Sequence, residues 1–322
     1  MTSKEKIPLI VICGATASGK TALGIELAKL FNGEIVSADS MQIYKGMTIA
    51  TAKPTAKEMQ GIPHHMMDFL SPESSYSVAE YVKEAKSVIA DIYSRKKTPL
   101  LVGGTGLYIQ SLLENICFGE IDVDENLRQE LYDRLQREGA ENLLHELAVF
   151  DEQSAQRIGT ANHRRLIRAI EIYYTTGKTM TEFIENSKNE PSPYRDVRIG
   201  LTCQDRQKLY DRINRRVDEM IQSGLIDEAK EYLSKHYSNT SAKAIGYKEL
   251  SPYFEGTLSF TDAVENLKQA TRRYAKRQLT WFRRDKEIHW LYTDTTEKDE
   301  LIKKAVAIIK KSGILIDSIK GV

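Results

Sequence analysis

The sequence predicts an α/β fold, in which a parallel sheet carries helices on both faces and one all-helical domain is inserted. Short β-branched and apolar runs alternate with helical stretches early in the chain, which is typical of βαβ units. Charged amphipathic helices without strand-like runs replace this alternation over residues 117–194. We therefore assign residues 1–116 and 195–322 to the α/β core and 117–194 to the insertion.

The first predicted strand is the apolar run 9–12, and a helix with leucines at helical spacing follows over 23–30. The segment between them has the spacing Gly-x4-Gly-Lys-Thr and reads Gly14, Ala15, Thr16, Ala17, Ser18, Gly19, Lys20 and Thr21. Backbone N–H groups of such a loop surround phosphate oxygens, and the following helix N-terminus adds positive charge. The segment predicts a P-loop kinase-like sheet and a site for a phosphate chain, without saying whose phosphates are bound. Lys20 would supply a charge there, and Thr21 a hydroxyl for Mg²⁺.

Two further strands are predicted at 34–38 and 99–102, with a helix over 78–93 between them. Each strand runs into a polar loop, at 39–42 and at 103–106. Ligands of parallel sheets bind beyond the carboxyl ends of the strands. We therefore expect these two loops and the phosphate loop to form one site.

Asp39 is the candidate acid of this site. A carboxylate at a strand end beside a phosphate loop can accept a proton from an incoming nucleophile, although Asp also commonly caps a turn. The sequence places no other acid in these loops, which favours the first role. The strand at 99–102 ends in Gly103, where a P-loop NTPase often has a Mg²⁺-binding Asp, and this disfavours hydrolysis. Gly103 would serve close packing or backbone approach to a ligand, and Thr105 offers one hydroxyl.

The rest of the chain is mostly helical. Helices are predicted in the insertion over 127–137, 143–150 and 163–174. A fourth strand at 197–201 follows the break Pro191-Ser192-Pro193, residues 205–286 are again helical, and a last short strand is predicted at 289–291.

Basic residues cluster on helices although the chain is nearly neutral, with 46 Lys and Arg against 45 Asp and Glu. Most single basic helix faces are solvated surface. The stretch 268–286 is more strongly basic, and a polyanion is its natural partner. A nucleic acid would therefore be held by such clusters and not by the net charge.

Cysteine usage and hydropathy indicate the compartment. The three cysteines are scattered without a Cys-x2-Cys pair, which argues against a disulfide framework or a zinc site and fits a reducing cytosol. The polar start lacks a secretory pattern, and no apolar run is long enough to cross a bilayer. We expect a cytoplasmic monomer that does not bind membranes.

Several of these segments together resemble the bacterial tRNA dimethylallyltransferase family. The resemblance extends over about residues 8–292 and includes the phosphate loop, Ser37-Ala38-Asp39-Ser40-Met41-Gln42-Ile43-Tyr44, Thr51-Ala52-Lys53-Pro54, Gly103-Gly104-Thr105-Gly106-Leu107-Tyr108, Asn162-His163-Arg164-Arg165, Ala244-Ile245-Gly246-Tyr247 and Ala275-Lys276-Arg277-Gln278-Leu279-Thr280-Trp281-Phe282-Arg283. Two positions depart from the family pattern, since Ala15 replaces the usual Pro and Ala50 a frequent Gly.

This resemblance implies prenyl transfer. The phosphate loop, residues 14–21, would hold the diphosphate of dimethylallyl diphosphate rather than ATP, with Mg²⁺ on Thr21. Asp39 would act as general base toward, or orient, the exocyclic N6 of adenine 37, which lies 3′ to the anticodon. Lys20, Thr21 and Arg216 would stabilise the departing diphosphate, although Arg212 and Arg215 lie on the same predicted helix.

The resemblance also implies that the partner is a tRNA anticodon stem-loop. The base would be flipped into a channel between the domains, lined by Thr105. The residues implied in tRNA binding are Asp39, Ser40, Met41, Gln42, Thr105, Arg128, Arg164, Arg165, Arg168, Arg273 and Arg277.

Two other function classes remain open at the level of sequence. A P-loop with an Asp after the second strand also suits a small-molecule kinase, which would consume ATP with an alcohol. A nucleotide-dependent RNA-binding protein would show RNA affinity without forming a product.

Overall fold

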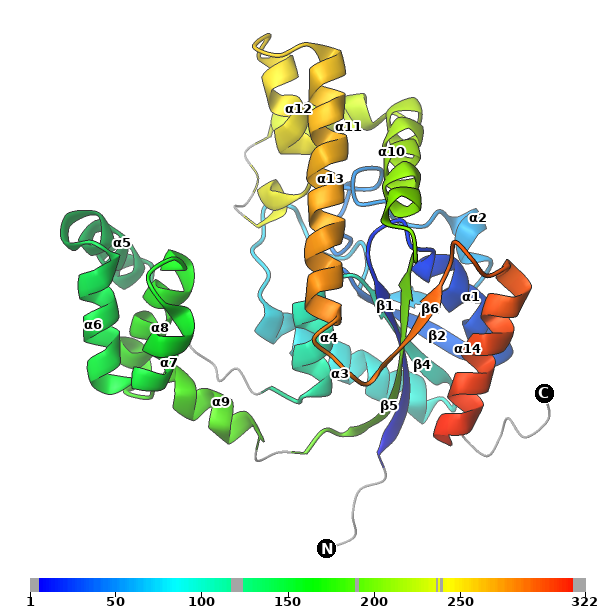
Figure 1. The fold of residues 1–322 in the computed structure, drawn as a ribbon, viewed down its shortest axis with the longest axis horizontal. Helices are drawn as coiled ribbons and strands as arrows, with labels where there is room; N and C mark the ends of the chain where they lie inside the picture. Colours follow the sequence, from blue (N-terminus) through cyan, green and yellow to red (C-terminus); the bar gives the residue numbers. More distant parts are fainter. Residues whose placement is uncertain (1–5, 117–123, 189–190, 236, 238–239, 315–322) are drawn as a thin grey trace, which may run out of the picture. The chain divides into compact units, whose positions relative to one another are not determined.

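The computed structural model describes residues 6–116, 124–188, 191–235, 237 and 240–314. It divides into two compact units, an α/β core formed by Met1–Leu113 and Pro193–Val322, and a helical unit formed by Glu114–Ser192 (Figure 1). The insertion predicted at 117–194 corresponds to the helical unit. The predicted start at 117 lies outside the described residues, whereas Tyr194 at the other end pairs with Ile7 in the sheet of the core.

The described part of the core contains a six-stranded parallel sheet with the strand order β3-β2-β4-β1-β5-β6. Its strands are β1 (Ile7–Gly14), β2 (Gly33–Ala38), β3 (His64–His65), β4 (Thr98–Gly103), β5 (Tyr194–Thr202) and β6 (Ile288–Tyr292). Each of the five strands predicted from sequence lies inside one of these, which confirms the predicted parallel sheet. Strand β3 was not predicted, because two residues are too few to show a periodicity.

The register of the central strands brings their carboxyl ends together. Gly103 of β4 pairs with Cys13 of β1 on one side and with Ala38 of β2 on the other. The loops that follow β1, β2 and β4 therefore leave the sheet side by side, at the edge where ligands of parallel sheets bind.

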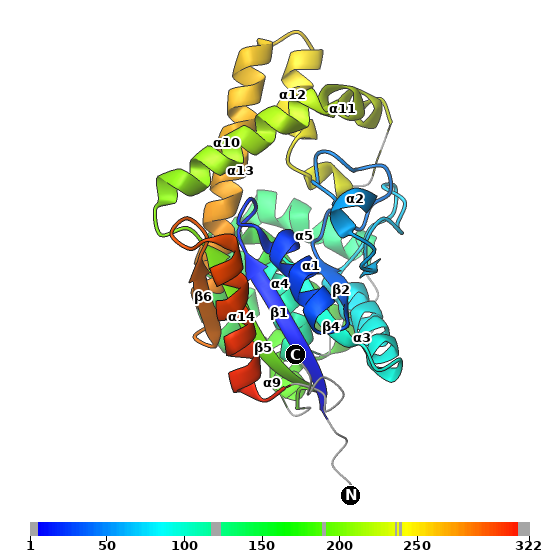
Figure 2. The ribbon, with the colours of Figure 1, turned by 90° about the vertical axis from the view of Figure 1, so that its right-hand side faces the viewer.

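Helices cover both faces of the sheet. The helices of the core are α1 (Lys20–Leu30), α2 (Ala56–Met59), α3 (Val78–Ser94), α4 (Gly106–Leu113), α10 (Arg206–Gln222), α11 (Leu225–Leu233), the 3₁₀ turn η1 (Ser241–Lys243), α12 (Tyr247–Phe254), α13 (Phe260–Phe282) and α14 (Lys298–Ser312). Helices α1 and α14 share a buried apolar cluster with five strands, to which Ile12, Leu27 and Ile309 belong. Helix α4 lies on the opposite side of the sheet from α14 (Figure 2). None of the described helices is long and apolar enough to cross a membrane.

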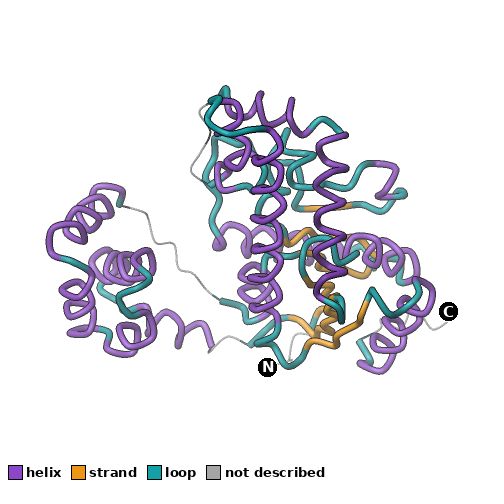
Figure 3. Tube along the Cα trace, turned by 45° about the horizontal axis from the view of Figure 1, so that its top comes forward, coloured by secondary structure: helices purple, strands orange, loops and turns teal. Residues whose placement is uncertain are grey.

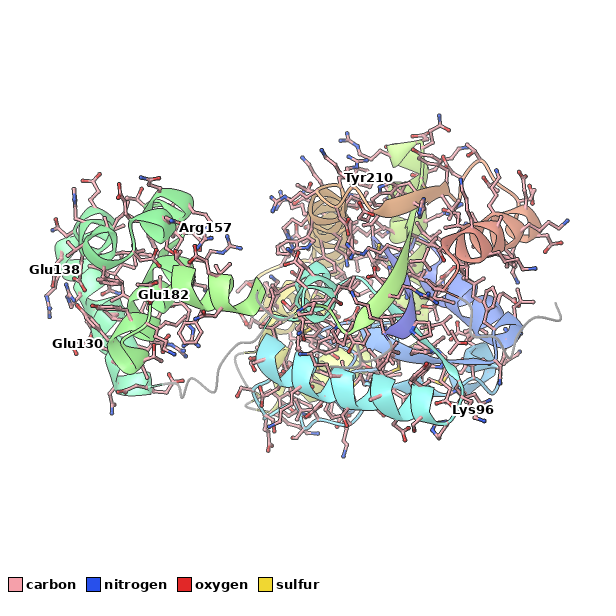
Figure 4. All side chains as sticks on the ribbon, turned by 90° about the horizontal axis from the view of Figure 1, so that it is seen from below. Lys96, Glu130, Glu138, Arg157, Glu182 and Tyr210 are labelled. Atoms are coloured by element: carbon pink, nitrogen blue, oxygen red, sulfur yellow. The ribbon has the colours of Figure 1, made fainter. Side chains whose placement is uncertain are left out.

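The described residues of the helical unit form helices joined by loops, without a strand, as Figure 3 shows. They are α5 (Glu125–Glu138), α6 (Ala140–Phe150), α7 (Glu152–Ile158), α8 (His163–Thr176) and α9 (Met180–Lys188). The unit has its own apolar core, in which Leu131, Leu147 and Leu166 are buried. Charged side chains such as Glu130 and Arg157 extend from its surface (Figure 4). The three helices predicted in the insertion are confirmed.

Candidate active site at the carboxyl edge of the sheet

The glycine-rich loop 14–21 connects β1 to α1 and forms a cavity of about 300 Å³. Gly14 lies against β5, where a Cβ atom would be 2.3 Å from the Leu201 carbonyl oxygen, so no side chain fits. Gly19 precedes α1 in a left-handed conformation, with φ of 88°, and no side chain caps the helix. The first N–H groups of α1 are therefore left for a ligand, which is the arrangement that binds phosphate oxygens.

Lys20 from the loop and Arg216 from α10 line this cavity. Its rim also includes Glu58, and Lys298 of α14, which is paired with Glu26 at 2.8 Å. Burial, together with the charge of Arg216, lowers the pKa of Lys20 to about 8, and burial lowers the pKa of Arg216. Lys20 Nζ donates to the Ala15 carbonyl oxygen at 2.5 Å. Within the described ranges neither Lys20 nor Arg216 forms an ion pair. The cavity is consequently suited to an anion that carries several charged oxygens.

The three candidate arginines of α10, Arg212, Arg215 and Arg216, are not equivalent. Arg212 is bound to Thr293, donating to its hydroxyl and to its carbonyl oxygen at 2.7 Å each. Arg215 is exposed and lies 3.7 Å from Glu219. Arg216 alone of the three lines the phosphate-loop cavity, which is the position expected of it.

Asp39 begins a tight turn directly after β2. Its Oδ1 accepts hydrogen bonds from the backbone N–H groups of Met41 at 2.9 Å and Gln42 at 3.4 Å. Oδ2 accepts no hydrogen bond from the described residues. Asp39 therefore uses one oxygen to cap the turn and keeps the other for a ligand. Its charge acts on both Lys20 and Arg216, whose pKa values it raises against the larger lowering effect of burial.

Thr105 connects the Asp39 turn to the loop after β4. Its backbone N–H donates to the Ala38 carbonyl oxygen, and its hydroxyl accepts from the backbone N–H of Ser40, both at 3.0 Å. The residue thus fixes the position of the turn, in addition to the ligand contact expected for it.

The side chain of Gln42 is engaged within the protein. Its Oε1 accepts from the Ser37 hydroxyl at 3.2 Å, and its Nε2 lies 3.1 and 3.3 Å from the carbonyl oxygens of Thr51 and Ala52. These bonds tie the Asp39 turn to the next loop. Ser40 and Met41 are half-buried on the same turn.

Gln278, which is not among the predicted site residues, joins two of the three loops. This buried side chain of α13 accepts from Thr16 N and donates to the Gly104 carbonyl oxygen, each at 2.9 Å. Added Cβ atoms would lie 2.2 Å from Gln278 Nε2 at Gly104 and 2.2 Å from Ala38 O at Gly103, so close packing explains both glycines. The sequence contains a signal for Gln278, because this polar residue falls between Ala275 and Leu279 on the apolar stripe of the helix. A polar side chain at such a position must find a hydrogen-bond partner inside the protein.

Tyr274, one turn before Gln278, is the second residue that was missed. The side chains of Thr105 and Gln278 lie near its hydroxyl. Burial, with the nearby charge of Asp39, raises the pKa of Tyr274. The phenol therefore stays neutral and can act as a hydrogen-bond donor beside the acid.

The basic face predicted on α13 is divided in two. Lys268 pairs with Asp218 at 2.6 Å, and Arg272 binds Glu265 and Asn214, so both are committed to contacts within the core. Arg273 and Arg277 are exposed, as is Lys276 between them, and the described residues offer them no ion pair. The exposed residues remain available for a polyanion.

The arginines predicted to bind tRNA in the helical unit fall into two pairs. Arg128 and Arg168 both bind the buried carboxylate of Glu171, at 2.9 and 2.8 Å. Arg164 and Arg165 are exposed in the first turn of α8. Arg164 also lines an open hollow of about 750 Å³ on this unit.

Comparison with known proteins gives consistent results. The family model described as IPP transferase matches residues 42–285. A tRNA dimethylallyltransferase of Bacillus subtilis (strain 168) is 49% identical over 305 residues, which are 94% of this chain and 96% of the relative. A tRNA dimethylallyltransferase of Oceanobacillus iheyensis is 48% identical and covers 92% of this chain and 95% of its own.

Solved structures are similar as well. The crystal structure of the full-length tRNA isopentenylpyrophosphate transferase from Bacillus halodurans has a TM-score of 0.71 and 42% identity, with 96% of this chain and 98% of that chain covered. A eukaryotic dimethylallyltransferase acting on tRNA has a TM-score of 0.80 and 30% identity, with 95% of this chain and 79% of that chain covered. With a family match over most of its length and relatives at nearly half identity, the chain belongs to the IPP transferase family, that of the tRNA dimethylallyltransferases.

Proposed function

We propose that the protein transfers the dimethylallyl group of dimethylallyl diphosphate to N6 of adenine 37 in tRNA and releases diphosphate. The observation that carries this proposal is the cavity of the loop 14–21. There Lys20 and Arg216 form no ion pair with any described residue, and one carboxylate oxygen of the nearby Asp39 is available. Its chemistry suits an anionic leaving group and a nucleophile that must lose a proton.

The cations act on the leaving group. As the bond from C1 of the prenyl group to the diphosphate oxygen breaks, its electron pair stays on the diphosphate. Lys20, Arg216 and the N-terminus of α1 are placed to stabilise this growing charge in a partly buried site.

Magnesium fits the same cavity through Thr21. Thr21 belongs to the lining, and Mg²⁺ is commonly held by few protein ligands together with substrate phosphates. No cluster of three or more His, Cys, Asp or Glu side chains that could hold a metal occurs among the described residues. Bound there, Mg²⁺ would neutralise charge on the diphosphate.

Asp39 acts on the nucleophile. The lone pair of the adenine amino group is delocalised into the ring, so N6 attacks C1 well only as it loses a proton. Oδ2 of Asp39 can take that proton while Oδ1 keeps the turn in place. The neutral hydroxyl of Tyr274 and the side chain of Thr105 adjoin the same acid.

Exposed arginines supply the tRNA contacts. We assign phosphate binding to Arg273 and Arg277 of α13 and to Arg164 and Arg165 of α8, because these four are exposed and have no acidic partner among the described residues. Phosphate contacts fix the position of the RNA without reading its sequence.

One assay tests the proposal. The protein is incubated with Mg²⁺, dimethylallyl diphosphate and an anticodon stem-loop, and the nucleosides are analysed by mass spectrometry. We expect one dimethylallyl group on adenine 37 and none on a stem-loop with guanine at that position. ATP with small alcohols should give no phosphorylated product. Phosphoryl transfer without prenyl transfer would instead support the kinase.

A further inference from the structure

A single carboxylate holds the loop 48–53, which follows the Asp39 turn. Glu228 of α11 accepts three consecutive backbone N–H groups, from Thr48 at 2.9 Å and Ile49 at 2.8 Å on Oε2 and from Ala50 at 2.9 Å on Oε1. The hydroxyl of Tyr247, a buried residue of α12, donates to Oε1 at 3.0 Å. Four donors thus converge on Glu228, although residues 48–50 lie about 180 positions away in the sequence.

The loop needs such an acceptor. Its internal bonds run from Ala52 N to Ile49 O at 2.9 Å and from Lys53 N to Thr48 O at 3.0 Å, so the first N–H groups of the loop lack partners within it, as at the start of a helix. A carboxylate satisfies them with charge-assisted bonds, which are stronger than neutral ones. Gly246 allows the loop to pack closely against the start of α12, because a Cβ atom at this position would lie only 3.1 Å from Ala50 Cβ.

Hydrogen bonds continue from this loop to the acid. The carbonyl oxygens of Thr51 and Ala52 accept from Gln42 Nε2, and the backbone N–H of Gln42 donates to Asp39 Oδ1. Each step is a direct contact between described atoms, and none involves the phosphate loop. Displacement of the loop would therefore be transmitted to the Asp39 turn.

We propose that Glu228 is a positioning residue, which acts through the loop 48–53 and Gln42 to hold the Asp39 carboxylate where it can take the adenine proton. The proposal rests on the function proposed above. It also gives a role to two motifs that the active site leaves unexplained, Thr51-Ala52-Lys53-Pro54 in the loop and Ala244-Ile245-Gly246-Tyr247 at the start of α12.

Glu228→Gln tests the proposal, because the amide keeps the shape of the side chain but turns one acceptor into a donor facing N–H groups. We expect the single-turnover rate at saturating substrates to fall about 10- to 100-fold, as for a catalytic group displaced by a fraction of an ångström to 1 Å. Diphosphate affinity, measured by calorimetry, should stay within about twofold, since the chain of bonds ends at Asp39. Tyr247→Phe, which removes one donor, should cause a smaller loss of rate in the same direction.

Tyr232→Phe is the matched control. It also lies on α11 and removes a buried hydrogen bond, from Tyr232 to Ser241 at 2.8 Å, but it does not touch the loop. We expect it to keep the wild-type rate. Hydrogen exchange of a peptide covering 42–53 should accelerate in Glu228→Gln and not in Tyr232→Phe.

The possible outcomes separate the two proposals. A wild-type rate in Glu228→Gln overturns the positioning role, and so does a parallel loss of diphosphate affinity, which would indicate a general structural defect. If Glu228→Gln does not fold, Tyr247→Phe decides by the same criteria. If the wild-type protein transfers no dimethylallyl group, the proposed function fails, while hydrogen exchange still reports whether Glu228 holds the loop.

Discussion

At the scale of single residues, Lys20 and Arg216 are held together at a cost. Burial disfavours the charged form of each, and the two cations repel one another. A bound diphosphate would offset both the burial of the two charges and their repulsion, because it supplies charged oxygens to each cation. The pair therefore contributes to the binding of an anion and not to the stability of the ligand-free protein.

The pKa of Lys20 gives a prediction on binding. Since this pKa lies at about 8, the amine is charged below that pH and neutral above it. We expect diphosphate affinity to fall as the pH rises through 8, by at most about tenfold per unit. Calorimetry between pH 7 and 9.5 measures it. Lys20→Arg stays charged and should give a flat profile; a flat profile in the wild type would contradict the assignment.

A second prediction concerns Asp39. Asp39→Asn keeps an oxygen that can cap the turn but removes the base, so the single-turnover rate should fall about 10²- to 10⁴-fold. Affinity for tRNA should change little, because the turn and the basic residues remain. Rapid-quench measurements at saturating substrates give the rate and filter binding the affinity. An unchanged rate would exclude Asp39 as the base.

At the scale of elements, α13 serves the site with two faces. Its inner face carries Gln278, which binds Thr16 of the phosphate loop and Gly104, and Tyr274, which lies near Thr105. Its exposed face carries Arg273 and Arg277. A single helix therefore holds the phosphate loop at a fixed distance from a basic surface, since a helix fixes the spacing of its side chains.

The buried face can be tested through stability. Gln278→Met leaves Thr16 N and Gly104 O without their partner, and we expect a loss of about 1–3 kcal/mol in the free energy of unfolding. Urea unfolding followed by circular dichroism measures it. Lys276→Met, on the exposed face of the same helix, is the control and should be nearly neutral. Equal stability of the two variants would show that the Gln278 bonds contribute nothing.

The exposed face can be tested through salt dependence. In Arg273→Gln/Arg277→Gln the slope of log affinity for tRNA against log salt concentration should decrease by about 2, because two phosphate contacts are lost. Fluorescence anisotropy from low to moderate salt measures the slope. Lys268→Gln/Arg272→Gln removes as much charge from the same helix, but from residues already paired, and should leave the slope unchanged. Equal slopes in both variants would remove α13 from the RNA interface.

At the scale of the whole molecule, the chain forms two units with separate apolar cores. The core alone contains the phosphate loop, the Asp39 turn and α13, whereas the helical unit contributes basic residues such as Arg164. Catalytic chemistry and part of the RNA binding are thus assigned to different units.

This division predicts the effect of removing the helical unit. If Glu114–Ser192 is replaced by a short glycine-serine linker, we expect the core to keep its diphosphate affinity, because no residue of the cavity is lost. Affinity for tRNA should fall as the phosphate contacts of Arg164 and Arg165 disappear. Calorimetry and filter binding test the two parts. Loss of diphosphate binding would show that the core depends on the helical unit.

Much of the fold could be predicted because its signals are local. The strands 9–12 and 34–38 are continuous apolar runs, which buried parallel strands require, and the insertion differs in its periodicity. The two-residue strand β3 could not be predicted, because its position depends on pairing with β2. Among the arginines of α10, the sequence left three candidates, and only packing places Arg216 in the cavity.

The sequence by itself determined the parallel sheet, the phosphate loop and the acid after the second strand, because each follows from a pattern of neighbouring residues. Only the tertiary structure decided how these parts are held in place. Gln278 meets Thr16 across 262 positions and Glu228 meets Ala50 across 178, and contacts over such separations leave no periodic trace in the sequence. They arise when buried polar groups must find partners in the folded chain, and those partners depend on how distant elements pack.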